Sequence, residues 1–195
     1  MPAAGSRPAG LAPDVARIHP APGPAESLEA ESLEACPGCG DRLPVIDGAR
    51  HVYAGASSAC WTRFAEWSSM PPRSPSSPLR RLAIDAYMVQ HPGVPERRAI
   101  QSVGLHLVGL WLCLERGLQP EDLASTLQRV MQHPPAWRWL DPPEPNGATT
   151  IGDVIAAGVD GREVVAVDAF VRGVWGAWAP HHDVVAGWAA DARIG

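Results

Sequence analysis

Proline and glycine interrupt the sequence at nearly regular intervals after residue 57, and this punctuation constrains the fold more than any other feature. Between the interruptions, apolar residues recur every three or four positions, as Trp61 and Phe64 do before the pair Pro71-Pro72. Such a period marks one face of an amphipathic helix, and proline either ends a helix or stands in its first turn. The pattern therefore predicts a series of helices joined by short connections.

The expected helices are about seven, and one of them differs from the rest. They span residues 58–70, 78–91, 95–116, 119–132, 151–158, 162–178 and 181–192. In the third, the stretch 99–114 is apolar nearly all round, which is typical of a helix that is buried on every side. We therefore expect an all-α fold, a compact bundle around this buried central helix.

The N-terminal part has a different composition. Residues 1–35 contain six prolines and few large apolar side chains, which predicts a disordered leader, because such a segment buries too little surface to offset its ordering entropy. Residues 36–195 are then expected to form a single helical domain, with 36–60 as a cysteine-bearing arm. Within the arm, 43–47 and 51–53 are expected to pair as a small hairpin across the Asp47-Gly48 turn.

Composition and charge exclude several classes of function. The chain has 16 basic residues, all arginine, so Schiff-base chemistry on lysine and a Walker phosphate loop are excluded. A net charge of -5 argues against nucleic acid as a partner. We see no signal peptide and no apolar run of membrane-spanning length, so we expect a cytoplasmic protein that does not enter the membrane.

The four cysteines predict a metal site. In a reducing compartment, cysteines favour metal binding or free thiols over disulfides. Cys36 and Cys39 flank a Pro-Gly turn, and Cys60 stands at the expected start of a helix, where the helix dipole stabilises a thiolate. A redox dithiol would need a strand before the motif and a helix directly after it, and neither is expected here. We therefore expect Zn²⁺ on these three thiols, and we interpret Cys113, within the apolar helix, as a buried thiol.

A structural zinc site requires a fourth ligand, and the sequence leaves three candidates open. His51 is nearest in the sequence, His91 lies at a helix end that could fold back, and Asp85 is the third. Among these we select His91 as the predicted ligand.

Several polar residues lie where an all-helical core has no evident need of them. His106 is on the apolar helix, and Asp85 is in the middle of another, with Arg80 or Arg81 one turn earlier as an expected ion-pair partner. The adjacent His181 and His182 begin the last helix, where the dipole favours neutral imidazole. Asp85, His106 and His182 are therefore the candidate catalytic residues, each with a structural alternative as a paired core or capping residue.

Several sequence blocks together resemble an uncharacterised bacterial protein family of unknown function. They are CPGCG at 36–40, Cys60-Trp61, DAYMVQHPG at 85–93, QSVGLHLVGL at 101–110, LERG at 114–117, and the Trp175, Trp178, His181 and His182 tail. The resemblance covers residues 36–192. It also implies a histidine near the start of the 78–91 helix, where this chain has Arg80 and Arg81. If that histidine is the fourth metal ligand in the family, this chain lacks the family's ligand at that position. It implies no reaction.

Two functions remain after these exclusions. The first is a zinc-binding helical protein whose metal is structural, acting as an interaction or accessory module for a protein partner, with the loop around Trp137 and Trp139 as a contact surface. The alternative is a metal-dependent enzyme that acts on a small molecule. Its pocket between helices would collect Asp85, His91, His106 and one of His181 and His182.

Overall fold

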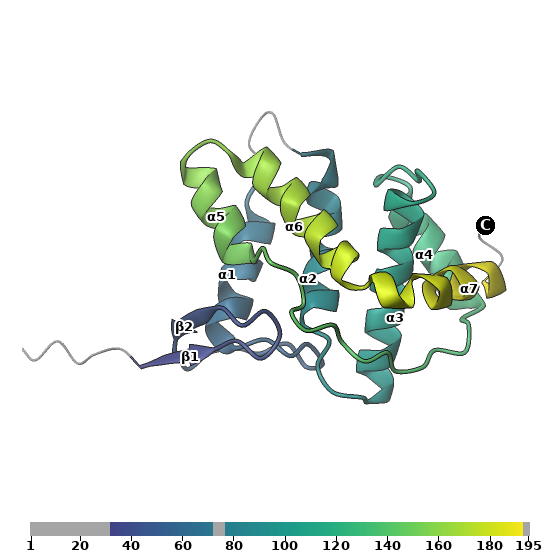
Figure 1. Ribbon diagram of the computed structural model, residues 1–195, viewed down its shortest axis with the longest axis horizontal. Helices are drawn as coiled ribbons and strands as arrows, with labels where there is room; N and C mark the ends of the chain where they lie inside the picture. Colours follow the sequence, from purple (N-terminus) through teal and green to yellow (C-terminus); the bar gives the residue numbers. More distant parts are fainter. Residues whose placement is uncertain (1–31, 72–76, 193–195) are drawn as a thin grey trace, which may run out of the picture. The chain divides into compact units, whose positions relative to one another are not determined.

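The computed structural model describes residues 32–71 and 77–192, all of which lie in one unit, Glu31–Gly195. Residues 1–31 of the expected leader lie outside the described part. The described residues form seven α-helices, two short 3₁₀ helices and one two-stranded hairpin (Figure 1), which confirms the expected helical fold. The helices are α1 Ser58–Ser69, α2 Ala83–Gln90, α3 Arg97–Leu114, α4 Leu123–Gln132, α5 Ile151–Val159, α6 Glu163–Ala177 and α7 His182–Asp191.

The helix ends follow the local signals in the sequence. The Ser57 side chain caps α1 by accepting a hydrogen bond from the backbone N–H of Cys60. Ser77 caps the 3₁₀ helix Pro78–Leu82, which leads directly into α2. Thr150 and Asp153 form a capping box at the start of α5. Because these signals act within one turn, the helix boundaries could be predicted from the sequence.

The central position in the bundle belongs to α2. This helix packs against α3 and α6, while α3 in turn packs against α4 and α7 (Figure 1). Every residue of α2 is buried except Ile84. The expected central helix, α3, buries one side and leaves Ser102 and His106 partly exposed. The reason is that α7 and α4 cover only part of the α3 surface, whereas the segments packed around α2 leave only Ile84 of that helix exposed.

The hairpin differs from the expected one. β1, Leu33–Ala35, pairs antiparallel with β2, Arg42–Pro44, so the expected pairing of 43–47 with 51–53 was wrong. The loop between the strands is the CPGCG segment, closed by the backbone N–H of Cys36 on the carbonyl of Asp41. Gly40 has a φ of 75°, which glycine adopts without strain. Leu33–Ala35, assigned to the leader from composition, thus belongs to the arm.

A further α5–α6 pair covers α1 and the other side of α2. No helix in the described ranges is both long and apolar enough to cross a membrane.

Candidate metal centre

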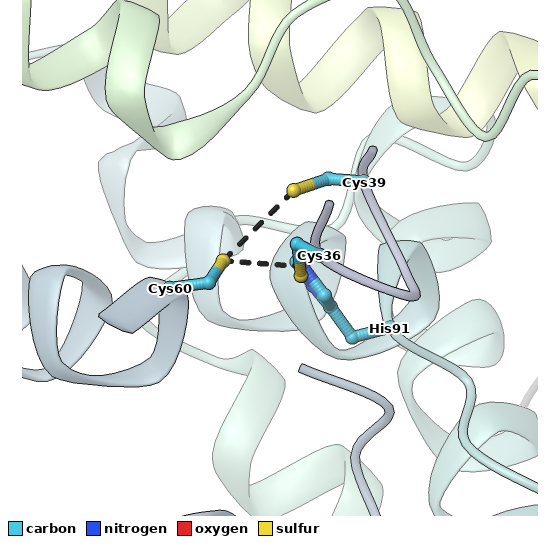
Figure 2. Close-up of side chains that lie close together, drawn as sticks. All are labelled: Cys36, Cys39, Cys60 and His91. Carbon is cyan, nitrogen blue, oxygen red and sulfur yellow. Dashed lines mark hydrogen bonds between the residues drawn. The ribbon is translucent and has the colours of Figure 1, made fainter. Parts of the chain in front are cut away.

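Four metal-ligating side chains converge from three separate segments of the chain (Figure 2). Cys36 and Cys39 come from the hairpin loop, Cys60 from the first turn of α1, and His91 from the residue that ends α2. Their ligand atoms all lie within 4.8 Å of one another. The group could therefore hold one metal ion, and His91 occupies the corner that the sequence left open.

The spacing of these atoms fits a tetrahedral ion. The Sγ atoms of Cys39 and Cys60 are 3.9 Å apart, and Sγ of Cys60 is 3.4 Å from Nε2 of His91. Ligands at zinc–sulfur and zinc–nitrogen distances of about 2.3 and 2.0 Å lie roughly 3.5–3.8 Å apart at tetrahedral angles. The two separations in the structure are close to that range, so little movement is needed for these atoms to share one ion.

The orientation of His91 leaves the correct nitrogen for a metal. Its Nδ1 lies 2.8 Å from the backbone carbonyl of Tyr87, which can only accept, so Nδ1 carries a proton. Nε2 then faces Cys60. Metal-bound histidines usually donate their other N–H to a carbonyl or carboxylate in this way, which fixes the tautomer and the ring orientation. Since His91 is fully buried, this arrangement also satisfies the donor that water cannot reach.

Two further groups donate to the thiol sulfurs. The backbone N–H of Ser57 is 3.4 Å from Sγ of Cys36, and the Tyr87 hydroxyl is 3.4 Å from Sγ of Cys60. Cys60 also lies in the first turn of α1, where the helix dipole favours negative charge. Cys36 and Cys60 are almost fully buried, so these donors replace the water that would otherwise solvate a thiolate.

The interactions within the cluster also divide its protons unequally when no metal is bound. Hydrogen bonds from Cys39 and Cys60 lower the pKa of the Cys36 thiol, and the hydrogen bond to Cys36 raises the pKa of Cys39. Burial lowers the pKa of His91, but hydrogen bonds to Cys36 and Cys60 outweigh it and raise that pKa to about 9. The metal-free cluster therefore favours a thiolate at Cys36 beside an imidazolium at His91.

The surroundings of the CPGC segment are not those of a thioredoxin-like dithiol. A strand, β1, does precede Cys36, which the sequence did not predict, but β2 and not a helix follows Cys39. The thiol-activating helix start belongs instead to Cys60, on a different segment. All four cysteines of the chain are free thiols. These features favour metal ligation over disulfide exchange.

The other open candidates for the fourth ligand have different partners. Asp85 is buried in α2 and its Oδ1 lies 2.8 Å from Nδ1 of His106 on α3. The expected ion pair of Asp85 with Arg80 or Arg81 is not formed, because Arg80 reaches Glu163 of α6 instead. His51 packs its ring against Tyr53 and Trp61.

The paired histidines before α7 contact backbone carbonyls. Nε2 of His181 donates to the carbonyl of Asp141, and Nε2 of His182 donates to that of Trp175. The His182 ring also stacks on the Trp175 indole, with ring centres 3.7 Å apart. The residues of the expected shared pocket therefore have separate partners. His91 lies with the cysteines, and Asp85 pairs with His106. His181 and His182 bond to backbone carbonyls.

The loop expected to form a contact surface is partly packed into the fold. Trp137 is half-buried, and its ring lies edge-on to Trp188 of α7 and against the backbone of α3 at Gly104. Trp139 is also only partly exposed.

Three residues of the centre were not singled out from the sequence. Tyr87 precedes His91 by one helical turn, a spacing that places both on one face of α2. Ser57 has the N-cap position three residues before Cys60. Gly38 allows the loop to lie against His91, since a Cβ there would be 2.3 Å from Cδ2 of the imidazole. The helical spacing would have identified Tyr87, whereas the role of Gly38 depends on a contact between distant segments.

Comparison with known proteins gives a family and no activity. The sequence model of a family of unknown function, DUF5946, matches residues 34–179, a span that includes all four residues of the cluster. Among curated proteins and among solved structures, none matches the chain significantly.

Proposed function

Because the chain belongs to the family of unknown function DUF5946, whose description assigns no activity, we propose a function from the site alone: the chain binds a structural Zn²⁺ and acts as an interaction or accessory module. The ligands are Cys36, Cys39, Cys60 and His91. The convergence of these four side chains from three segments is the observation that carries the proposal.

The donor set favours zinc and a structural role. Thiolates with one imidazole suit Zn²⁺ better than hard cations such as Mg²⁺ or Ca²⁺, which take oxygen ligands. Structural zinc sites have four protein ligands, whereas catalytic sites generally keep one position for water or substrate. Four protein donors within 4.8 Å leave no need for such a fifth group.

The hairpin of the arm buries little surface of its own. Each strand of the hairpin is three residues long, and Leu43 is the one strand residue in the described hairpin that is buried. Two-stranded hairpins of this size are marginal in water without further support. An ion shared by the arm, α1 and α2 would join segments that are distant in the sequence, which supports a stabilising role.

The direct test is metal analysis of the full-length protein together with thermal unfolding. We expect about one Zn²⁺ per chain, and a chelator should lower the melting temperature by at least about 5 °C, because a loss of 1 kcal/mol shifts it by about 2–4 °C in a chain of this size. The proposal fails if the protein purifies without zinc, does not take it up, and melts unchanged in chelator.

Matched cysteine variants separate the site from general thiol effects. Cys60→Ser should lose the ion, because Ser offers no thiolate. Cys113→Ser should retain it, because Cys113 lies on α3 and is not among the clustered ligands. Equal metal content in the two variants would show that Cys60 is not a metal ligand.

A metal-dependent enzyme is the second candidate. The observation that favours chemistry elsewhere in the fold is the buried carboxylate–imidazole pair of Asp85 and His106. In the described part of the chain, neither Asp85 nor His106 hydrogen-bonds to any of the four clustered ligands.

A further inference from the structure

Asp85 and His106 form a polar pair across the contact between α2 and α3. The Asp85 side chain is 8% exposed and that of His106 is 21% exposed, so the carboxylate is covered while the ring reaches the surface. The carboxylate accepts from Nδ1–H of His106 at 2.8 Å. Among the described residues, Nε2 of His106 has no hydrogen-bond partner. The pair therefore presents one edge of an oriented imidazole without a protein partner.

A glycine of α3 lies beside the carboxylate of this pair. A Cβ at Gly109 of α3 would lie 3.2 Å from Oδ1 of Asp85, so the small residue leaves room for the carboxylate. Burying a carboxylate is unfavourable unless it is hydrogen-bonded, and an apolar residue would pack here without that requirement. A function for the exposed edge of His106 would account for the pair better than packing does.

His106 opens onto a cleft of about 400 Å³. Its lining consists of Tyr53, Arg98, Gln101, Ser102, Leu105 and His106. Arg98, Ser102 and His106 follow one another at steps of four along α3, a spacing that places them on one face of the helix. The cleft is thus a polar stripe of α3 closed on one side by Tyr53 of the arm.

The charges and hydrogen-bonding groups of the lining favour an anion. Arg98 is its one permanently charged residue, no carboxylate is among the lining residues, and Arg98 makes no ion pair with any described residue. Ser102 and Tyr53 offer hydroxyl donors, and Nε2 of His106 is a third donor whenever the ring carries both protons. Arginine binds carboxylate and phosphate oxygens well because its planar group can offer two parallel N–H donors.

We propose that this cleft is a binding site for a small molecule that carries a carboxylate or phosphate group, with Arg98 pairing with the anion and the doubly protonated ring of His106 donating to it through Nε2–H. Asp85 is a positioning residue, because it holds the ring by Nδ1 and does not reach the bound molecule itself. The site is separate from the metal cluster: the two share α2, but Asp85 and His91 are six residues apart, or roughly 9 Å along a helix.

No residue that lines the cleft carries a negative charge that would repel a bound anion. His51 stacks on Tyr53, and burial, with a smaller repulsion from His106, lowers the pKa of His51, so this neighbour stays neutral at physiological pH. The nearest buried carboxylate described at the site is Asp85, which is already paired with His106.

The test is NMR of the zinc-loaded full-length protein labelled with ¹⁵N in its histidine rings. Inorganic phosphate and acetate are the two probes, titrated separately, and His106→Gln assigns the His106 signals. We expect a saturable shift of the Nε2 resonance with at least one probe, and the stronger probe identifies the anion class. A shift that follows ionic strength equally for phosphate, acetate and chloride would overturn the proposal, as would no saturable shift at millimolar phosphate and acetate.

A matched pair of arginine variants provides the control. Arg98→Gln should weaken binding of the effective probe at least tenfold. Arg97→Gln removes the same charge one position earlier, from a residue that does not line the cleft, and should leave the affinity within about twofold. Equal effects of the two substitutions would show a general charge effect and would contradict a specific site.

Asp85→Asn tests whether Asp85 fixes the tautomer of His106. A purely structural role of Asp85 would leave that tautomer unchanged. An amide can donate as well as accept, so it no longer requires a proton on Nδ1. In the anion-free protein at alkaline pH, where the ring is neutral, the ¹⁵N shifts of His106 should therefore show a mixture of the two tautomers. Unchanged tautomer signals would contradict the assignment. If this variant does not fold, Arg98→Gln and His106→Gln still decide the proposal. Zinc content should be unaffected in all three, so failure here leaves the metal centre untouched.

Discussion

The backbone of Gly38 lies directly against the imidazole of His91. An added Cβ at position 38 would be 2.3 Å from Cδ2 and 2.7 Å from Cγ of the ring, and 2.8 Å from the carbonyl oxygen of Gln90. Real Cβ atoms do not approach other heavy atoms this closely, so only glycine allows the hairpin loop to reach the end of α2. Gly38, one of the two residues between Cys36 and Cys39, therefore determines whether the fourth ligand can meet the thiols.

Gly38→Ala should weaken both metal binding and folding. The methyl group has to displace either the His91 ring or the loop, and the backbone carbonyl of Gln90 limits the second movement. We expect the affinity for Zn²⁺ to fall and the zinc-loaded protein to lose about 1–3 kcal/mol of unfolding free energy, the usual cost of overpacking. Competition with a chromophoric chelator and chemical denaturation measure the two effects.

Gly173→Ala is the matched control. Gly173 is in the middle of α6, and an added Cβ there meets no heavy atom within 4 Å. Alanine should be neutral or stabilise by up to about 1 kcal/mol, because it is the better helix former. A Gly38→Ala protein with native zinc affinity and native stability would show that the loop does not press on His91.

Tyr87→Phe should lower the affinity for metal while leaving the fold intact. The Tyr87 hydroxyl donates to Sγ of Cys60, and its ring stacks on Phe64 with ring centres 3.8 Å apart. Phenylalanine keeps the stacked ring and removes only the donor. Loss of such a supporting hydrogen bond typically costs about 10–100-fold in metal affinity. Zinc competition measures the change, and an unaltered dissociation constant would mean that the hydroxyl does not support the thiolate.

Much of the fold could be predicted from the sequence because helix boundaries are local. The caps at Ser57, Ser77 and Thr150 each act within one turn of their own helix. The hairpin could not be predicted in the same way, because three-residue strands carry almost no periodicity and their pairing depends on the loop between them. We expected α3 to be central because its sequence is apolar nearly all round. Which helix is central depends instead on the helices that pack around it, and in the structure these surround α2.

In the candidate site, too, the features set by local sequence could be predicted, and those set by tertiary contacts could not. The thiols were recognisable because the spacing of Cys36 and Cys39 and the position of Cys60 at a helix start are visible in the sequence. The choice of His91 over His51 and Asp85 depends on where α2 ends relative to the hairpin loop, which is a tertiary relation. The partner of Asp85 was predicted on its own helix, whereas the structure supplies His106 from α3.

Gly104→Ala tests the packing of α3 against the loop that carries Trp137. A Cβ at Gly104 would lie 2.3 Å from Cε3 of that indole, so the ring would have to move away from α3. We expect a loss of about 1–3 kcal/mol in unfolding free energy, with zinc stoichiometry unchanged, because the substitution is on the side of α3 that faces Trp137 and not the metal cluster. A change in zinc content would mean that the two regions are coupled.

Cys113 should react slowly with thiol reagents at neutral pH and progressively faster at alkaline pH. Burial, followed by the negative charges of Asp85 and Glu121, raises the pKa of this thiol to about 11. Since the thiolate is the reactive form, a rise from about 9 to 11 lowers its fraction at pH 8 by about 100-fold. In the zinc-loaded protein the other three thiols are expected to be ligated, so alkylation followed by mass spectrometry reports on Cys113.

The sign of the accompanying stability change follows from the same shift. A thiol whose pKa is higher in the folded state stabilises the fold fully below the unfolded value of about 9, and this contribution is lost as the pH rises towards 11. The Cys113→Ser variant should therefore show a shallower decline of melting temperature over that range than the native chain. Asp85→Asn, which removes one of the two negative charges, should speed alkylation of Cys113 at a fixed pH. Cys113 is partly buried, and rapid alkylation of the native residue at pH 7 would contradict the raised pKa of its thiol.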